Sequence, residues 1–292
     1  MDAIGSGIWQ AKGPRHGVHI VVLGGVHGDE KTGIDVVRKL HALFTAGDEH
    51  LAAGTLTLVL GNEEAIRLIQ RGTSVEHNLN RLFTEKHLAG PVLDFYESRR
   101  AHQLAPLLAS ANVSIDLHST SSPSSPFLPC AFSPRHERIY RWFSCDLVLT
   151  DPDYILGGER ATTDEYVDSC GGAGICFETG FAGDTSRAPA VFESIKQVLA
   201  DVGLIIPARP LSPPEPDYRV YRIVRRIFLS PDGFSYAAKF PESFQPVQKG
   251  EVIGYHGTRP EIAEEEGVIV FPKARELWHP GHDIFFLARR IR

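Results

Sequence analysis

The stretch His19–Gly33, HIVVLGGVHGDEKTG, joins an apolar run to two side chains of the kind that bind metals. Its first half is continuously apolar, which is the pattern of a strand covered on both faces. Two glycines end this run, and His27 and Glu30 follow where we expect the chain to turn. Apolar residues then recur at helical spacing, which predicts a helix through Ile34, Val37, His41 and Phe44.

Outward from this stretch, strands and helices alternate from Val18 to about Leu204. This order predicts an α/β fold, with a mostly parallel or mixed sheet and helices on both of its faces. The predicted strands are 18–25, 55–62, 113–120, 146–150 and 172–180. Besides the helix through Ile34 and Phe44, helices are predicted over 63–70, 90–111 and 189–203.

A change of composition predicts a boundary in the chain. Five prolines lie between Pro207 and Pro216, which is typical of a stiff linker. Short strands are predicted after it, at 218–229, 234–240, 251–257, 267–271 and 283–291. Gly and Pro turns separate them, and they show no helical period. We therefore expect three parts, an α/β domain over 1–206, a proline-rich linker over 207–217 and a small all-β domain over 218–292.

Polar side chains occur where the predicted strands of the first domain end. Carboxyl ends of parallel strands meet at one edge of the sheet, where ligands bind. We expect the following residues at that edge: His27 and Glu30, Asn62, His118, and Glu178.

Two imidazoles and one carboxylate are a typical ligand set for catalytic zinc, which leaves one position open for water. The sequence therefore predicts that His27, Glu30 and His118 bind one Zn²⁺ per chain. Asp116 lies on the same strand face as His118, where it either orients an imidazole or is a buried polar residue.

Each of these residues also has a structural explanation. A single histidine such as His118 is often hydrogen-bonded in a core, and Glu30 is favoured at a helix start. Glu178 is more unusual, because a carboxylate that ends a buried strand needs a partner or a shifted pKa. A phosphate-binding loop is disfavoured, because the glycine-rich bend lacks the P-loop lysine and carries Asp29 and Glu30.

Composition excludes several classes of protein. The net charge of −6 is not that of a general nucleic-acid binder, and no apolar run approaches the ~20 residues of a membrane span. We find no signal peptide pattern and no C-x-x-C among the four cysteines. These features predict a cytoplasmic protein with reduced thiols and without membrane or nucleic-acid partners.

Four motifs resemble one known family. GGVHGDE, NLNRLF, DLHST and CFETG, in this order and at these spacings, are similar to the succinylglutamate desuccinylase and aspartoacylase family, within the zinc carboxypeptidase superfamily. The resemblance covers most of the chain and is looser after the proline-rich segment. It implies hydrolysis of the amide between a small acyl group and an acidic amino acid, by attack of a zinc-bound water.

The resemblance also implies roles for individual residues. His27, Glu30 and His118 correspond to the zinc ligands, and Glu178 to the general base that activates the water. By the same resemblance, Arg71 lies near the scissile carbonyl, while Asn80 and Arg81 hold a substrate carboxylate. These expectations agree with the chemistry of each side chain, since a guanidinium suits both an oxyanion and a carboxylate.

Alternatives remain at this stage. The chain could be a zinc carboxypeptidase acting on peptides, or a zinc-binding protein without catalysis. Aspartoacylase has an arginine ten residues before its catalytic glutamate, and Asp168 holds that place here, which favours a desuccinylase-like or broader substrate preference over N-acetylaspartate. The sequence leaves the acyl group, the pathway and the oligomeric state open, with a homodimer as one option.

Overall fold

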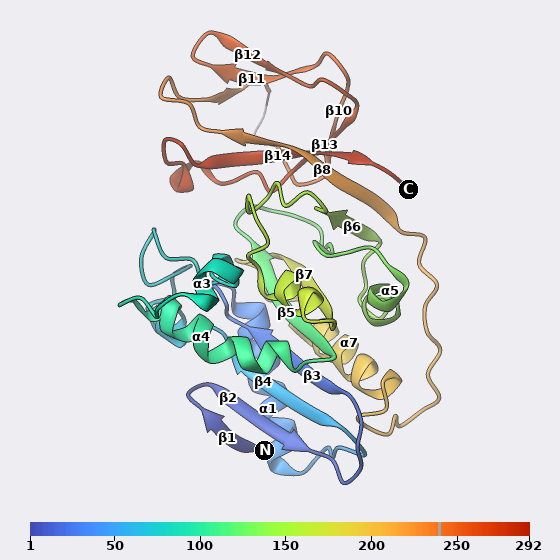
Figure 1. Ribbon diagram of the computed structural model, residues 1–292. Coiled ribbons are helices and arrows are strands. Elements are labelled where there is room, and N and C mark those ends of the chain that lie inside the picture. The colour runs from blue at the N-terminus through green and yellow to red at the C-terminus, as the bar shows by residue number, and fades with distance from the viewer. Residues whose placement is uncertain (239–240) are drawn as a thin grey trace.

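The computed structural model describes residues 1–238 and 241–292 as an α/β part that carries two small β-sheets (Figure 1). The N-terminus lies at the end of the molecule away from these small sheets. The predicted strand over 234–240 forms only as β9 (Ser235–Tyr236), and residues 239–240 lie outside the described part of the chain.

The first sheet has the order β1-β2-β4-β3-β5-β7. Strands β4, β3, β5 and β7 run parallel to one another, as predicted. Strands β2 and β1 extend the sheet beyond β4 in antiparallel directions, and they were not predicted. Both strands are short, and β1 is mostly exposed, so neither shows a clear apolar pattern in the sequence. The bounds are β1 (Asp2–Gly5), β2 (Ile8–Lys12), β3 (His19–Gly24), β4 (Thr55–Leu60), β5 (Val113–Thr120) and β7 (Ala173–Phe181).

Helices cover both faces of this sheet, which confirms the α/β prediction. The helix predicted over 90–111 begins only at Tyr96, because residues 90–95 are not helical. The helices are α1 (Lys31–Ala46), α2 (Glu63–Leu68), α3 (Glu85–Ala89), α4 (Tyr96–Ala109), α5 (Pro134–Tyr140), α6 (Thr163–Ser169) and α7 (Ala188–Asp201), with 3₁₀ turns η1 (Leu79–Arg81) and η2 (Arg275–Leu277).

Strand β3 explains why the opening run is apolar throughout. Ile20 and Val22 pack in the core beneath α1 and α7, whereas Val21 and Leu23 pack in the core beneath α4. Successive side chains of a strand point to opposite faces, so a strand buried on both faces needs apolar residues at every position.

The remaining strands form two small sheets, ordered β10-β13-β14-β8-β6 and β12-β11-β9. Most of them match the predicted all-β region, although β10 and β12 were not predicted. The bounds are β6 (Leu147–Thr150), β8 (Arg219–Phe228), β10 (Gln245–Val247), β11 (Val252–His256), β12 (Arg259–Ile262), β13 (Gly267–Val270) and β14 (Asp283–Arg290).

The prediction that residues 146–150 belong to the first sheet is wrong. Strand β6 instead pairs in parallel with β8, with Leu147 opposite Arg219. Val148 packs into the core of the α/β part, while Leu147 and Leu149 pack among apolar residues of the second sheet. The apolar pattern of this strand requires only that both of its faces be covered. Because either sheet could cover them, the pattern did not reveal which sheet the strand joins.

Residues 207–217 contain no helix or strand, and the division into domains at this segment stays a prediction. Because β6 precedes the segment and pairs with a strand that follows it, the two parts share a sheet across the proposed boundary.

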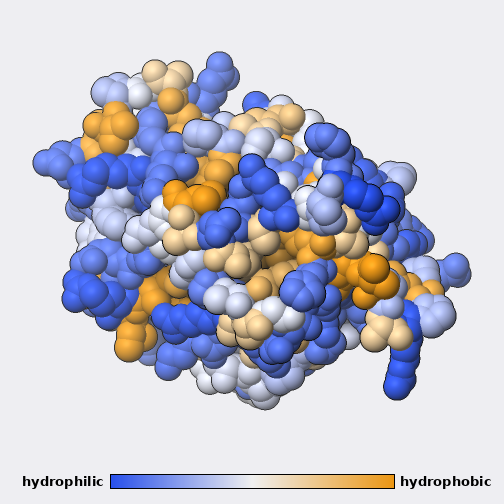
Figure 2. Space-filling model, turned by 90° about the horizontal axis from the view of Figure 1, so that it is seen from below, coloured by the Kyte–Doolittle hydropathy of each residue, from blue (hydrophilic) through white to orange (hydrophobic). Residues whose placement is uncertain are grey.

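None of the helices in the described part of the chain is long and apolar enough to span a bilayer. On the face that Figure 2 shows, apolar residues lie in separate groups among polar ones.

The expected association of two copies into a homodimer stays a prediction.

Two glycines let α1 approach the sheet unusually closely. A Cβ on Gly33 would lie 2.6 Å from the backbone oxygen of Leu117, and a Cβ on Gly24 would lie 2.2 Å from the backbone oxygen of Gly33. Neither contact can be relieved by moving a side chain, because both involve backbone atoms. The start of α1 therefore lies directly against β3 and β5.

We expect Gly33→Ala to destabilise the protein by about 1–3 kcal/mol, the usual cost of overpacking. This sign is informative, because alanine in place of a helical glycine would otherwise stabilise by up to about 1 kcal/mol. Urea denaturation of both proteins measures the difference. Equal or greater stability of the alanine variant would contradict the close approach of α1 to β5.

Candidate active site

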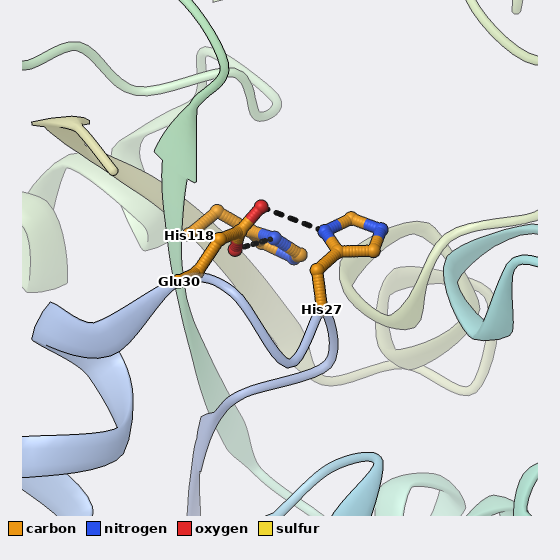
Figure 3. Close-up of side chains that lie close together, drawn as sticks. All are labelled: His27, Glu30 and His118. Atoms are coloured by element: carbon orange, nitrogen blue, oxygen red, sulfur yellow. Dashed lines mark hydrogen bonds and ion pairs between the residues drawn. The ribbon is translucent and has the colours of Figure 1, made fainter. Parts of the chain in front are cut away.

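His27, Glu30 and His118 lie together at the carboxyl edge of the first sheet (Figure 3). His27 and Glu30 come from the bend between β3 and α1, and His118 comes from the end of β5. Gly25 opens the bend with a φ of +71°, which a residue with a Cβ rarely adopts. This glycine turns the chain sharply after the strand.

The carboxylate of Glu30 lies between the two imidazoles. Its Oε1 is 2.8 Å from Nδ1 of His27, and its Oε2 is 2.9 Å from Nδ1 of His118. All three side chains are buried, and their potential ligand atoms lie within 4.8 Å of one another. Burial alone would raise the pKa of Glu30, but the two histidines outweigh it and hold that pKa far below its usual range.

The second ring nitrogen of His27 reveals the protonation state of the ring. Nε2 of His27 lies 3.0 Å from Oδ1 of Asn78, and the same oxygen accepts a hydrogen bond from the backbone N–H of Asn80. Oδ1 can only accept, so Nε2 must be the nitrogen that carries the proton. Burial, together with Arg71, lowers the pKa of His27 to about 4, so the ring is neutral at pH 7.

A neutral His27 that is protonated at Nε2 turns a bare Nδ1 toward the Glu30 carboxylate. Two acceptor atoms then face each other at 2.8 Å, an arrangement that a cation between them would stabilise. Neutral imidazole and carboxylate are also the donors that zinc prefers. The residues present therefore fit a bound divalent metal.

His118 has a similar arrangement on its far side. Its Nε2 lies 3.0 Å from Oδ2 of Asp116 and 3.3 Å from Nδ2 of Asn80, and Asp116 in turn accepts a hydrogen bond from Thr163 Oγ1. Asp116 thus contacts an imidazole, as one of its two sequence-based interpretations proposed. Such contacts fix the orientation of a metal-binding histidine.

Glu178 lies opposite His118 in the parallel register of β5 and β7. Its backbone exchanges two hydrogen bonds with Phe127, which fixes the end of β7. Oε2 is buried and has no hydrogen-bond partner among the described residues, and burial raises the pKa of this carboxyl group to about 8. An unpaired oxygen of Glu178 therefore lies buried beside the His27, Glu30 and His118 triad.

Arg71 reaches the same site from the loop after α2. Its guanidinium lies 3.3 Å from Oε1 of Glu30, and about half of its side chain is exposed. The fully buried carboxylate of Glu97 anchors this loop, because it accepts hydrogen bonds from the backbone N–H and hydroxyl of Thr73. Asn62 donates to the same carboxylate and caps α2. Asn62 thus contributes to structure at this edge.

The 3₁₀ turn η1 carries Asn80 and Arg81. The side chain of Asn80 is buried, accepts from the backbone N–H of Thr163 and lies against His118, so it already has protein partners. Arg81 donates to the backbone oxygen of Asn80 and has no carboxylate within ion-pair distance in the part of the chain that the structure describes. Its positive charge is therefore available to a ligand.

The structure places Asp168 away from this site. Asp168 accepts hydrogen bonds from Nε2 of His136 and from the backbone N–H of Gly174, near the start of β7, whereas Glu178 lies near the end of that strand. The substrate argument drawn from Asp168 is therefore wrong, because the ten-residue spacing does not bring the two carboxylates to the same edge.

Sequence reasoning missed Asn78 and Glu97. Asn78 stands just before Asn80 and Arg81 in NLNRLF, and Glu97 is an acidic residue in a predicted helix. The full burial of Glu97 indicates that its carboxylate stabilises the structure. No sequence pattern shows that it binds the loop that carries Arg71.

We expect His118→Ala to lose most of its bound metal after purification and dialysis, because one of three ligands is removed from a rigid site. Metal analysis of the purified protein measures this. His136→Ala is a matched control, since it removes another buried histidine far from the triad and should keep the metal. Full metal retention by His118→Ala would remove this residue from the site.

Comparisons with known proteins agree with this geometry. Residues 16–198 match the succinylglutamate desuccinylase/aspartoacylase catalytic domain. A probable aspartoacylase of Nostoc is 37% identical over 108 residues, which are 35% of this chain and 35% of that protein. The chain thus aligns with only about a third of the length of such relatives.

A succinylglutamate desuccinylase of Burkholderia orbicola aligns more widely, with 26% identity over 280 residues, 87% of this chain and 76% of the relative. Among solved structures, the succinylglutamate desuccinylase of Chromobacterium violaceum superposes with a TM-score of 0.76 at 22% identity, covering 99% of this chain and 90% of that one. This likeness shows a shared fold. With the catalytic-domain match over more than half of its residues, the chain belongs to the succinylglutamate desuccinylase/aspartoacylase family.

Proposed function

We propose that this protein is a zinc-dependent amidohydrolase that removes the acyl group from a small N-acyl acidic amino acid. The observation that carries the proposal is the unpaired Oε2 atom of Glu178, which lies beside the buried triad of His27, Glu30 and His118. In that triad, Nδ1 of His27 carries no proton. The relatives named as desuccinylase and aspartoacylase support the reaction class.

His27, Glu30 and His118 would hold one Zn²⁺ per chain. A bound zinc ion supplies a Lewis acid and lowers the pKa of water toward about 7. Asn78 and Asp116 keep the two imidazoles oriented so that their Nδ1 atoms face Glu30. A rigid triad of this kind avoids reorganisation of the ligands during the reaction.

Glu178 would act as the general base. Its free Oε2 can take a proton from water, and a base works best when its pKa lies near the working pH. Burial raises the pKa of Glu178 to about 8, so its ionised form is a stronger base than an exposed carboxylate. The same group can return the proton to the leaving amine.

Arg71 and Arg81 would supply positive charge to the substrate. Arg71 lies at the rim of the triad, where a guanidinium can stabilise the developing oxyanion. Arg81 can bind a substrate carboxylate through charge-assisted hydrogen bonds. Asn80 would hold Arg81 in place through its backbone oxygen, and its remaining amide proton is available to the same carboxylate.

A panel of N-acyl amino acids and short peptides, assayed with and without a chelator, tests the reaction class. Hydrolysis of the N-acyl amino acids that stops with chelator supports the proposal. Preferential cleavage of peptides would indicate a carboxypeptidase, and metal binding without any hydrolysis would indicate a non-catalytic zinc protein.

We expect Glu178→Gln to keep its metal while kcat falls by roughly 100-fold or more, the scale of general base catalysis. Glutamine has nearly the same shape but cannot accept the proton. Steady-state kinetics and metal analysis on the same preparation measure both quantities. A kcat within a few-fold of the wild type would reject Glu178 as the base.

We expect Arg81→Ala to raise KM for acidic N-acyl amino acids by about 10-fold or more, because a charge-assisted hydrogen bond is lost. The change in kcat should be smaller than in Glu178→Gln. Arg67→Ala removes an exposed arginine that pairs only with Glu64 and serves as the control. An unchanged KM in Arg81→Ala would show that the substrate carboxylate binds elsewhere.

A further inference from the structure

One fully buried carboxylate lies outside the triad and takes no direct part in the proposed chemistry. Glu97 belongs to α4, and its side chain is inaccessible to solvent. In the described part of the chain no lysine or arginine pairs with it, and Nδ1 of His77 lies 4.0 Å from its Oε2. Burying a carboxylate is unfavourable unless hydrogen bonds satisfy its oxygens. The donors that satisfy Glu97 therefore indicate what this side chain holds in place.

Neutral donors from two segments satisfy the Glu97 carboxylate. Its Oε1 accepts hydrogen bonds from the side-chain amide of Asn62 at 2.9 Å and from the backbone N–H of Thr73 at 2.7 Å. Its Oε2 accepts the hydroxyl of Thr73 at 2.8 Å. Asn62 caps α2 and donates its own backbone N–H to the oxygen of Gly25, in the bend after β3. Glu97 thus links α4 to the segments on both sides of α2.

The loop 69–78, which follows α2, carries Arg71 toward the triad. Glu30, at 3.3 Å, is the only hydrogen-bond or ion-pair partner of the Arg71 guanidinium among the described residues. About half of this side chain is exposed, so close packing does not hold it either. The position of the guanidinium therefore depends on the course of the backbone, which Glu97 holds at Thr73, two residues further on.

The conformation of this loop is imposed by its contacts. Ile69 is β-branched and has a φ of +55°, which such residues rarely adopt. A Cβ on Gly72 would lie 2.3 Å from the backbone oxygen of His77, so the loop folds back closely on itself. The ring of His77 stacks on that of Phe95, just before α4, with the ring centroids 4.0 Å apart. A loop held in this way opens more readily when one of its contacts is removed.

We propose that Glu97 is a positioning residue for the hydrolysis: by holding Thr73, it keeps Arg71 at the triad. There the guanidinium can stabilise the developing oxyanion. This inference rests on the proposed deacylase function. Glu97 itself touches neither substrate nor metal. Without its contact to Thr73 the loop would open, and the charge of Arg71 would be absent from the site for most of the time.

Thr73→Val tests the contact, because valine has nearly the shape of threonine but cannot donate to Oε2 of Glu97. With an N-acyl amino acid that the wild type hydrolyses, we expect kcat to fall by about 10-fold, the scale of one buried hydrogen bond. KM should change much less, and bound zinc should be retained, because the ligands and the carboxylate-binding Arg81 are unaltered. Thr73→Ser keeps the hydroxyl and should restore most of kcat.

Trypsin measures the opening of the loop without any substrate, since it cleaves after arginine and requires a locally unfolded segment. We expect the bond between Arg71 and Gly72 to be cut about 10-fold faster in Thr73→Val than in the wild type. Thr57→Val is a matched control, because it removes a buried hydroxyl that accepts from Gln10, near the start of β4. It should change neither kcat nor this cleavage.

A double-mutant cycle tests whether the effect on kcat passes through Arg71. Arg71→Ala alone should lower kcat, and adding Thr73→Val should then lower it by less than about three-fold more. Glu97→Asp keeps the carboxylate but shortens the side chain by one methylene, which withdraws it from the loop. It should therefore reproduce the loss of kcat that Thr73→Val causes.

The outcomes separate this inference from the proposed function. Wild-type kcat or wild-type cleavage in Thr73→Val would overturn the role of Glu97, and so would the full loss of kcat in the Arg71→Ala background. Equal losses in Thr57→Val would indicate general destabilisation and would also overturn it. A zinc-loaded wild type that hydrolyses no N-acyl amino acid would reject the proposed function and the role of Glu97 in it, while trypsin would still decide whether Glu97 holds the loop.

Discussion

The Glu30 carboxylate held between two imidazoles is the interaction on which the rest of the site depends. It joins residues 88 positions apart in the chain and requires the start of α1 to lie directly against β5. That approach is possible only because Gly24 and Gly33 have no side chains. The bare Nδ1 of His27 then leaves the buried carboxylate facing an acceptor, which is unfavourable without a cation. Folding therefore brings the proposed metal ligands together before any metal binds.

The convergence of the candidate site residues could be predicted from sequence, because the strand ends of a parallel sheet meet at one edge. His27, Glu30, His118 and Glu178 meet there, as that rule requires. Their supporting contacts could not be predicted in the same way. Each supporting residue acts through a partner distant in sequence, as Glu97 does on the loop of Arg71, and neither periodicity nor motif spacing encodes such pairs.

Two errors in the predicted fold have related physical causes. An apolar strand can pair with any sheet that has a free edge and in which both faces of the strand become covered. The apolar pattern at 146–150 therefore did not reveal that β6 pairs with β8. Spacing along the chain was also a poor guide near β7. Helix α6 and the turn after it return the chain to the start of this strand, and Asp168 is used there to hold His136 and Gly174.

The pairing of β6 with β8 also has a consequence for synthesis of the protein on the ribosome. The ribosome releases residues 147–150 well before residues 219–228. Until β8 has been made, Leu147 and Leu149 lack most of the apolar side chains that they contact in the folded protein. During this interval an unpaired strand edge is open to other nascent chains. Co-translational folding of the α/β part therefore remains incomplete until β8 has been translated, which favours late, concerted closure of the second sheet.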